Sequence, residues 1–172
     1  MTVIRQDDFI DSVADALQFI SYYHPLDFVK AVNEAYEREQ NPAARDAMAQ
    51  ILINSRMCAQ GRRPICQDTG IVTVFLKIGM NVQWDADLSV ADMVNEGVRR
   101  AYTHPDNVLR ASILEDPAGA RRNTKDNTPA VIHMEVVKGD TVEVQVAAKG
   151  GGSENKSKLV MLNPSDSIVE WV

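Results

Sequence analysis

The sequence has few cysteines, no basic surplus and no long apolar run. Its two cysteines, Cys58 and Cys66, are too few for a disulfide scaffold and fit a reducing, intracellular compartment. No stretch of roughly 18 or more apolar residues is present, so the sequence predicts no membrane span. Because 18 lysines and arginines stand against 24 aspartates and glutamates, the acidic balance argues against a nucleic-acid binder. A local basic cluster could still bind a small anion.

The length and composition suit one folded unit. The chain has 172 residues, of which 45% are hydrophobic, and it can therefore bury a core. It contains no internal repeat and no low-complexity linker that would mark a second domain. Residues 1–8 are acidic and lack the apolar centre of a signal peptide, so we expect a cytoplasmic protein.

The first 60 residues have the periodicity of helices. Apolar residues recur at spacings of three and four over residues 9–20 and again over residues 28–36. Pro25 is suited to the first position of the second helix. Residues 41–42, Asn-Pro, then predict the capped start of a third helix. In the break before Pro25, His24 is expected to be a surface or capping residue.

Beyond residue 70 the pattern becomes that of a sheet. Residues 71–78 are mostly β-branched or aromatic and predict a well-buried strand. A capping-box pattern beginning at Ser89 predicts a crossover helix. Residues 130–137 and 141–148 are expected to pair as a hairpin around a Lys-Gly-Asp turn.

These patterns together predict an α+β fold. About three helices over residues 1–60 are followed by a mixed β-sheet with a crossover helix over residues 61–172. Asn163 and Pro164 indicate the start of another helix, which Val172 would cut short at about nine residues, below the typical length. We therefore expect residues 1–172 to be a single N-terminal fragment of a longer protein.

One cysteine lies on a short, stiff connection before the predicted strand. Pro64 fixes its own φ and favours extended geometry at Arg63, while Gly70 can adopt a positive φ. This arrangement presents the thiol of Cys66 beside the amide, carboxylate and hydroxyl of residues 67–69. A lone cysteine beside a strand is more often a small buried hydrophobe than a ligand. Both interpretations stay open on this segment by itself.

Three consecutive glycines, Gly150, Gly151 and Gly152, follow the last predicted strand. They add nothing to a core and are costly in conformational entropy, so they indicate close approach of backbone to a ligand. A phosphate-binding Walker A loop does not fit, because Asn155 stands where its second glycine is required. Backbone N–H groups there can instead bind a carboxylate, with a neighbouring lysine supplying charge.

Arg110 lies in the long aperiodic segment 103–129, but between apolar residues rather than in a run of charges. A segment of this length without periodicity is usually functional or disordered. An arginine held between apolar neighbours suits a bidentate grip on a carboxylate. For any single arginine of the segment, a solvated loop is the simpler alternative.

Three motifs together resemble the N-terminal region of class I, iron–sulfur-dependent fumarate hydratases. They are RPICQDTG at 63–70, NTKDNTPA at 123–130 and AKGGGSENK at 148–156, and related L-tartrate dehydratases share parts of them. The resemblance implies a lyase of the tricarboxylic acid cycle that adds water reversibly to fumarate, giving L-malate. It also implies a homodimer and an oxygen-sensitive 4Fe-4S cluster, held by three cysteines with one iron open to the dicarboxylic acid substrate.

The family's functional residues carry over onto five places in this chain. Cys66 corresponds to the first cluster ligand, and Gln67 and Asp68 correspond to residues that contact the substrate. Asp68 is in addition a candidate general acid. Arg110 corresponds to a carboxylate-binding arginine, and Gly150–Gly152 correspond to the backbone loop at the substrate.

Other parts of the family's site have no counterpart in this chain. The second and third cysteine ligands, the threonine proposed as base, and further arginine and lysine contacts lie beyond Val172 in the family pattern, and Cys58 matches none of the ligands. We therefore expect this chain by itself to hold no cluster and to be inactive. Two alternatives stay open, namely L-tartrate as the substrate and a non-catalytic anion-binding or assembly module.

Overall fold

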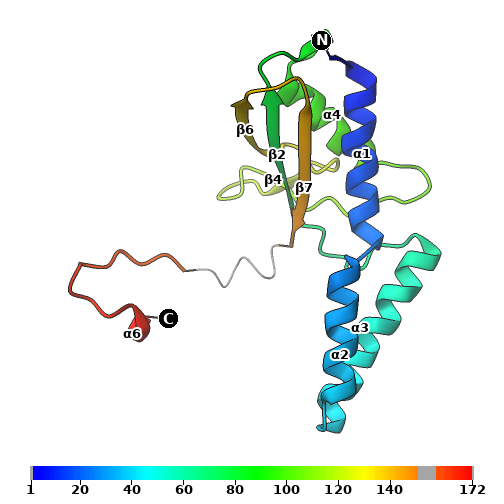
Figure 1. Cartoon of the computed structure of the whole chain (residues 1–172), viewed down its shortest axis with the longest axis vertical. Coiled ribbons are helices and arrows are strands. Elements are labelled where there is room, and N and C mark those ends of the chain that lie inside the picture. Colours follow the sequence, from blue (N-terminus) through cyan, green and yellow to red (C-terminus); the bar gives the residue numbers. More distant parts are fainter. Residues whose placement is uncertain (1, 151–157, 172) are drawn as a thin grey trace.

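The computed structural model describes residues 2–150 and 158–171 (Figure 1). The elements in chain order are β1 (Val3–Arg5), α1 (Gln6–Tyr22), α2 (Leu26–Arg38), α3 (Pro42–Gly61), β2 (Ile71–Gly79), β3 (Gln83–Asp85), α4 (Val90–Tyr102), β4 (Leu114–Glu115), β5 (Arg122–Asn123), β6 (Val131–Val137), β7 (Val142–Lys149) and α6 (Ile168–Trp171). The predicted α+β class, with helices first and a mixed sheet after them, is confirmed. Within the described residues, no helix is long and apolar enough to cross a membrane.

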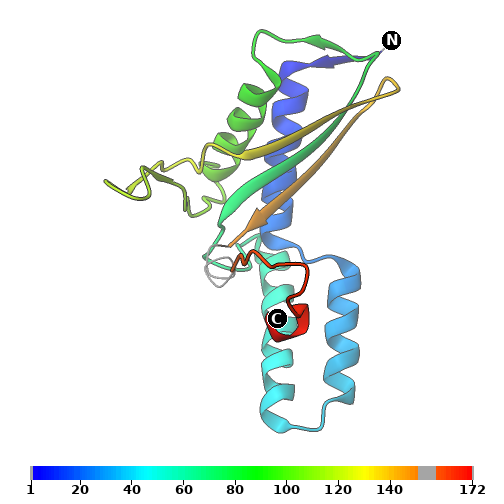
Figure 2. The ribbon, with the colours of Figure 1, turned by 90° about the vertical axis from the view of Figure 1, so that its left-hand side faces the viewer.

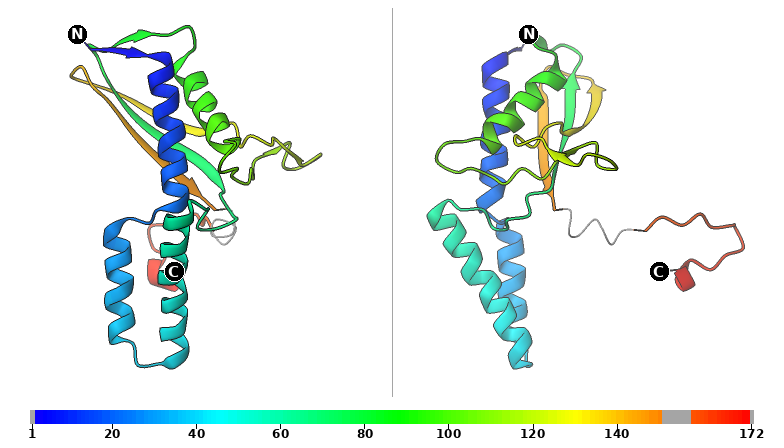
Figure 3. Two further views of the ribbon diagram at one scale, coloured as in Figure 1. Left: turned by 90° about the vertical axis from the view of Figure 1, so that its right-hand side faces the viewer. Right: turned by 180° about the vertical axis from the view of Figure 1, so that it is seen from behind.

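Two layers form the body of the protein. Helices α1 and α4 cover one face of a three-stranded sheet in the order β6-β2-β7 (Figures 1 and 3). Alternate residues of β2 point towards the helices, and Val72, Val74 and Leu76 are almost completely buried there. The two helices approach closely because Gly97 has no side chain, since a Cβ at that position would lie 2.8 Å from Cβ of Val13.

The predicted hairpin is wrong in its pairing. Both of its strands form, as β6 and β7, but β2 lies between them and pairs in parallel with β6 and antiparallel with β7. Residues 138–141 pass over the end of β2, where the N–H of Gly79 donates to the carbonyl of Thr141 at 2.9 Å. β2 carries the fully buried residues of the sheet, so its backbone N–H and C=O groups need hydrogen-bond partners on both edges. The neighbouring strands β6 and β7 supply these partners.

Helices α2 and α3 extend from the body as an antiparallel helical arm (Figure 2). Asn41 caps α3 as predicted, because its side chain accepts from the N–H groups of Ala43 and Ala44 at 2.9 and 3.4 Å. Pro25 occupies the N-cap of α2, one residue before the predicted place, and the helix begins at Leu26. None of the side chains of α2, all described by the structure, is buried.

Three further elements differ from the sequence-based expectation. The connection after β2 contains β3, which pairs in parallel with β1, and the aperiodic segment contains the small β4–β5 pair. The last helix starts later than Pro164. The carboxylate of Asp166 accepts from the N–H of Asn163 at 2.7 Å and closes a turn, and α6 begins only at Ile168.

Candidate functional site

Cys66 lies on the loop between α3 and β2, and its side chain is exposed. In this chain, Cys66 is therefore not a small buried hydrophobe. The backbone N–H of Asp68 donates to the sulfur of Cys66 at 3.4 Å. The thiolate is the form of a cysteine that binds metal.

The loop before Cys66 is tied to two helices. The N–H of Ile65 donates to the carbonyl of Ser21, at the end of α1, at 2.8 Å. From α3, the side-chain amide of Asn54 donates to the carbonyl of Ile65 at 3.1 Å. The buried thiol of Cys58 donates to the carbonyl of Pro64 at 3.6 Å, so Cys58 supports the loop from inside. These contacts agree with the prediction that Cys58 is structural.

The turn after Cys66 lies against the end of β7. Gly70 has a φ of 66°, and a Cβ at this position would lie 1.6 Å from the carbonyl oxygen of Lys149, so only glycine fits. A Cβ on Gly150 would lie 3.2 Å from Cγ of Asp68. The beginning of the predicted glycine loop is thus next to the Asp68 carboxylate. Residues 151–152, the rest of that loop, lie outside the described residues.

One open cavity of about 450 Å³ brings three of the predicted substrate residues together. Gln67, Asp68 and Arg110 line it, with Ser112 and Asn123 beside them. The arrangement places a guanidinium, a carboxylate and polar amides around a space that fits a small diacid. Arg110 can bind a carboxylate in this space, and Asp68 can donate or accept a proton.

A second cavity, of about 210 Å³, shares Asp68 with the first and also includes Cys66 and His24. The ring of His24 packs on Phe28 with a centroid distance of 4.6 Å. Its Nδ1 is buried and has no hydrogen-bond partner within the part of the chain that the structure describes, and burial lowers the pKa of His24. Sequence reasoning expected a surface or capping residue, because a histidine in a break between helices carries no signal of a nearby cavity.

Two residues that sequence reasoning did not single out connect the loops around the first cavity. The hydroxyl of Thr69 donates to the backbone carbonyl of Arg110. Asn127 is completely buried and hydrogen-bonds both to Gly70 and to Ser112, two residues after Arg110. The available signal was weak, since Asn127 belongs to the NTKDNTPA motif but lies in a polar segment without periodicity.

Cys66 fits one corner of an iron–sulfur cluster, because such clusters are held by cysteine thiolates and this thiol is exposed beside a cavity. No group of three His, Cys, Asp or Glu side chains able to hold a metal ion exists in residues 2–150 and 158–171. Within those residues, Cys66 is therefore a single candidate ligand and not part of a complete metal site.

Comparison with known proteins gives a consistent set of relatives. Residues 10–172 match the family described as fumarate hydratase (Fumerase). The putative L(+)-tartrate dehydratase subunit alpha of Methanocaldococcus jannaschii is 32% identical over 163 residues, covering 92% of this chain and 56% of that protein. The anaerobic class I fumarate hydratase of Escherichia coli K12 is 36% identical over 110 residues, 64% of this chain and 20% of that enzyme. The chain thus spans about half of the first relative and about a fifth of the second.

Proposed function

The chain belongs to the fumarate hydratase (Fumerase) family, and we propose that it supplies one cluster ligand and part of the substrate site of a hydro-lyase that interconverts fumarate and L-malate. The observation that carries the proposal is the shared cavity of Gln67, Asp68 and Arg110, directly beside the loop of the exposed Cys66. Arg110 lies more than forty positions after Gln67 and Asp68 in the sequence, and the fold brings the three residues around one space large enough for a diacid.

In the proposed site, the thiolate of Cys66 would hold one corner of a 4Fe-4S cluster. When bound, the cluster supplies an open iron that acts as a Lewis acid on a carboxylate and a hydroxyl of the substrate. The guanidinium of Arg110 binds a substrate carboxylate through two parallel N–H donors. The side-chain amide of Gln67 can donate to the same diacid and fix its orientation.

Asp68 is the proposed proton carrier. Hydration of fumarate adds a hydroxyl to one carbon of the double bond and a proton to the other carbon. As general acid, the carboxyl group of Asp68 donates that proton, and in dehydration its carboxylate takes the proton back. Its half-buried position next to Gly150 supports this role, because it faces the cavity without being fully solvated.

We propose that further polypeptide completes the enzyme, since the chain covers 56% and 20% of the two relatives named above. That polypeptide would bring the other two cluster cysteines and the base that activates water. On this proposal the 172 residues are inactive by themselves. The homodimer and the cytoplasmic location remain predictions.

L-tartrate is a second candidate substrate. The L(+)-tartrate dehydratase subunits alpha match over most of this chain, with 92% and 93% of it covered, whereas the class I fumarate hydratase of E. coli matches over 64%. Tartrate differs from malate by one hydroxyl, and a site built to hydrogen-bond a hydroxyl strongly rejects the substrate that lacks it.

The complete protein, purified without oxygen and reconstituted with iron and sulfide, tests both candidates. We expect iron–sulfur absorbance and turnover of fumarate and L-malate, and the ratio of kcat/KM for L-malate and L-tartrate identifies the preferred substrate. A complete protein that binds no cluster, or turns over neither diacid, contradicts the proposal. If it binds diacids in calorimetry without turnover, the anion-binding alternative is correct.

A further inference from the structure

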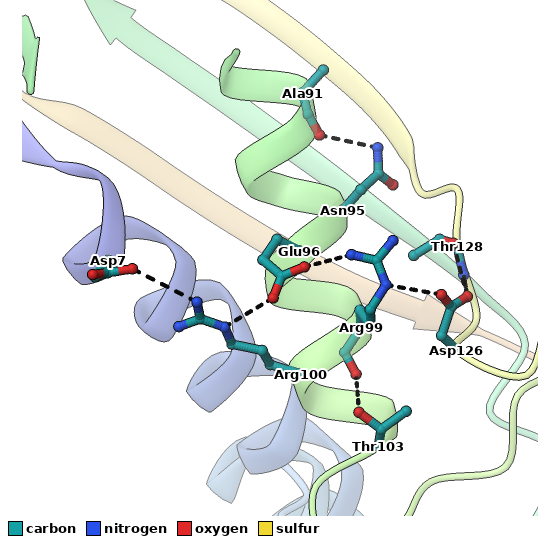
Figure 4. A network of polar contacts seen from close by, with 9 residues as sticks. All are labelled: Asp7, Ala91, Asn95, Glu96, Arg99, Arg100, Thr103, Asp126 and Thr128. Atoms are coloured by element: carbon teal, nitrogen blue, oxygen red, sulfur yellow. Dashed lines mark hydrogen bonds and ion pairs between the residues drawn. The ribbon is translucent and has the colours of Figure 1, made fainter. Parts of the chain in front are cut away.

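The NTKDNTPA segment, residues 123–130, contributes Asn123 and the buried Asn127 to the surroundings of the first cavity, and α4 holds the segment firmly. Figure 4 shows Arg99 between Glu96, on its own helix, and Asp126, on the segment. Nε of Arg99 donates to Asp126 at 3.0 Å, and the N–H and hydroxyl of Thr128 donate to the same carboxylate at 3.0 and 2.8 Å. Burial would raise the pKa of Asp126, but these hydrogen bonds outweigh burial and lower the pKa. The segment is thereby fixed to the helical layer.

Asn127, the next residue, connects two loops of the site. Its side chain is completely buried, and its backbone has a φ of 62°. The side-chain oxygen accepts from the N–H groups of Ser112 and Ile113 at 2.7 and 3.2 Å, and the side-chain nitrogen donates to the carbonyl of Gly70 at 3.0 Å. Because a buried amide must satisfy its polar atoms, these bonds fix the turn before β2 against the segment between Arg110 and β4.

Two neighbours reinforce this connection. The hydroxyl of Thr69 donates to the carbonyl of Arg110, directly across the same gap. Tyr102, at the end of α4, is 1% exposed and hydrogen-bonds to Thr69 and Asn127. Burial raises the pKa of Tyr102, although these hydrogen bonds oppose the rise. The loops are thus joined from inside by a network of directional hydrogen bonds.

We propose that Asn127 is a positioning residue that sets the distance between Arg110 and the turn carrying Cys66 and Asp68. This inference rests on the hydro-lyase function proposed above. Fumarate is rigid, with its two carboxylates held apart by the double bond, so the groups that grip it must keep a fixed separation. A misplacement of about 1 Å can cost about a hundredfold in rate.

Asn127→Asp tests the inference with a nearly isosteric change. It keeps the oxygen that accepts from Ser112 and Ile113 but removes the N–H that donates to Gly70. Gln18→Glu is the matched control, because Gln18 is also buried and its side-chain nitrogen donates to the carbonyls of Ala101 and Asn107 at 2.6 and 3.0 Å. Neither of these residues lines the first cavity.

Both variants are made in the complete, cluster-loaded enzyme. Relative to Gln18→Glu, we expect Asn127→Asp to lower kcat/KM for fumarate at least tenfold at equal iron content per folded protein. Hydrogen exchange in the cluster-free protein gives a second readout. Exchange at residues 66–70 should rise in Asn127→Asp and stay unchanged in Gln18→Glu. Equal kcat/KM in the two variants, with unchanged exchange at residues 66–70, overturns the inference.

A second pair decides the question if Asn127→Asp does not fold. Thr69→Val removes the hydroxyl that donates to Arg110, and Thr69→Ser restores it. We expect Thr69→Val to lower kcat/KM about tenfold and Thr69→Ser to recover most of that loss, whereas equal values in the two variants overturn the inference. An inactive wild-type enzyme refutes the proposed function and this inference with it. An active wild type, with variants whose kcat/KM equals that of the wild type, refutes only the role of Asn127.

Discussion

The two-layer body and the loops around Cys66 are held together by different interactions. In the body, apolar side chains such as Val74 and Val98 are completely buried between sheet and helices. In the loops, exposed or half-buried polar residues are held by hydrogen bonds, for example from Asn54 and Asn127. The free energy gained by burying apolar side chains depends on the buried area and changes little when atoms shift slightly. The strength of a hydrogen bond depends on the direction of its donor and acceptor. We therefore expect changes in the body to alter stability, and changes in the loops to alter chemistry.

The largest expected effect is that of Cys66→Ser in the loops. On the proposed function, losing a cluster ligand should remove the iron–sulfur absorbance and lower activity by more than about a hundredfold. Mutation of residues that only hydrogen-bond to metal ligands already lowers metal affinity or activity by about 10–100-fold. Iron content and anaerobic turnover check this. Cys58→Ser is the control, because the buried Cys58 should affect stability and leave the cluster in place. Equal iron loss in the two variants would contradict the assignment of Cys66.

Asp68→Asn sharpens the comparison, because it leaves the loop geometry almost unchanged. Loss of a general acid should lower kcat by about 10²–10⁴-fold while the cluster and the thermal unfolding midpoint stay as in the wild type. Steady-state kinetics with fumarate, together with absorbance and a thermal melt, measure the three quantities. A kcat within a factor of two of the wild type would assign the proton transfer to another residue.

Val74→Ala tests the body. Removing two buried methyl groups at a 0% exposed position should destabilise the protein by about 2–3 kcal/mol, while kcat per folded molecule stays constant. Denaturant titration and kinetics at low temperature separate these two effects. Val136→Ala, at a position that is 69% exposed, is the control and should change stability by less than about 0.5 kcal/mol. A fall in kcat for Val74→Ala would break the distinction between body and loops.

The smallest expected effect concerns Asp126, where loop and body meet. Its pKa is lowered in the folded state, so its stabilising contribution is present above the unfolded pKa and disappears as pH falls through the folded value, below about pH 4. Asp126→Asn should therefore destabilise residues 123–130 at pH 7, and destabilise them less at about pH 3. Hydrogen exchange of this segment at the two pH values measures the difference. An equal change in hydrogen exchange at the two pH values would contradict this expectation.

Elements with strong local patterns were predicted well from the sequence. The apolar stripe of α1, the capping box at Ser89 and the β-branched run of β2 each act within a few residues, and the structure contains all three elements. The strand pairing was predicted wrongly, because a hairpin rule considers only neighbours in sequence. It could not show that β2, about sixty residues earlier, would lie between β6 and β7.

The sequence by itself determined the α+β class and most of the helices and strands, and it proposed Gln67, Asp68 and Arg110 as substrate residues. Only the tertiary structure decided that Gln67, Asp68 and Arg110 share one cavity, that Cys58 is buried while Cys66 is exposed, and that Asn127 joins the two loops. The physical reason is distance along the chain. Asn127 and Gly70 are 57 residues apart, and contacts of that kind depend on how whole layers pack rather than on local preference.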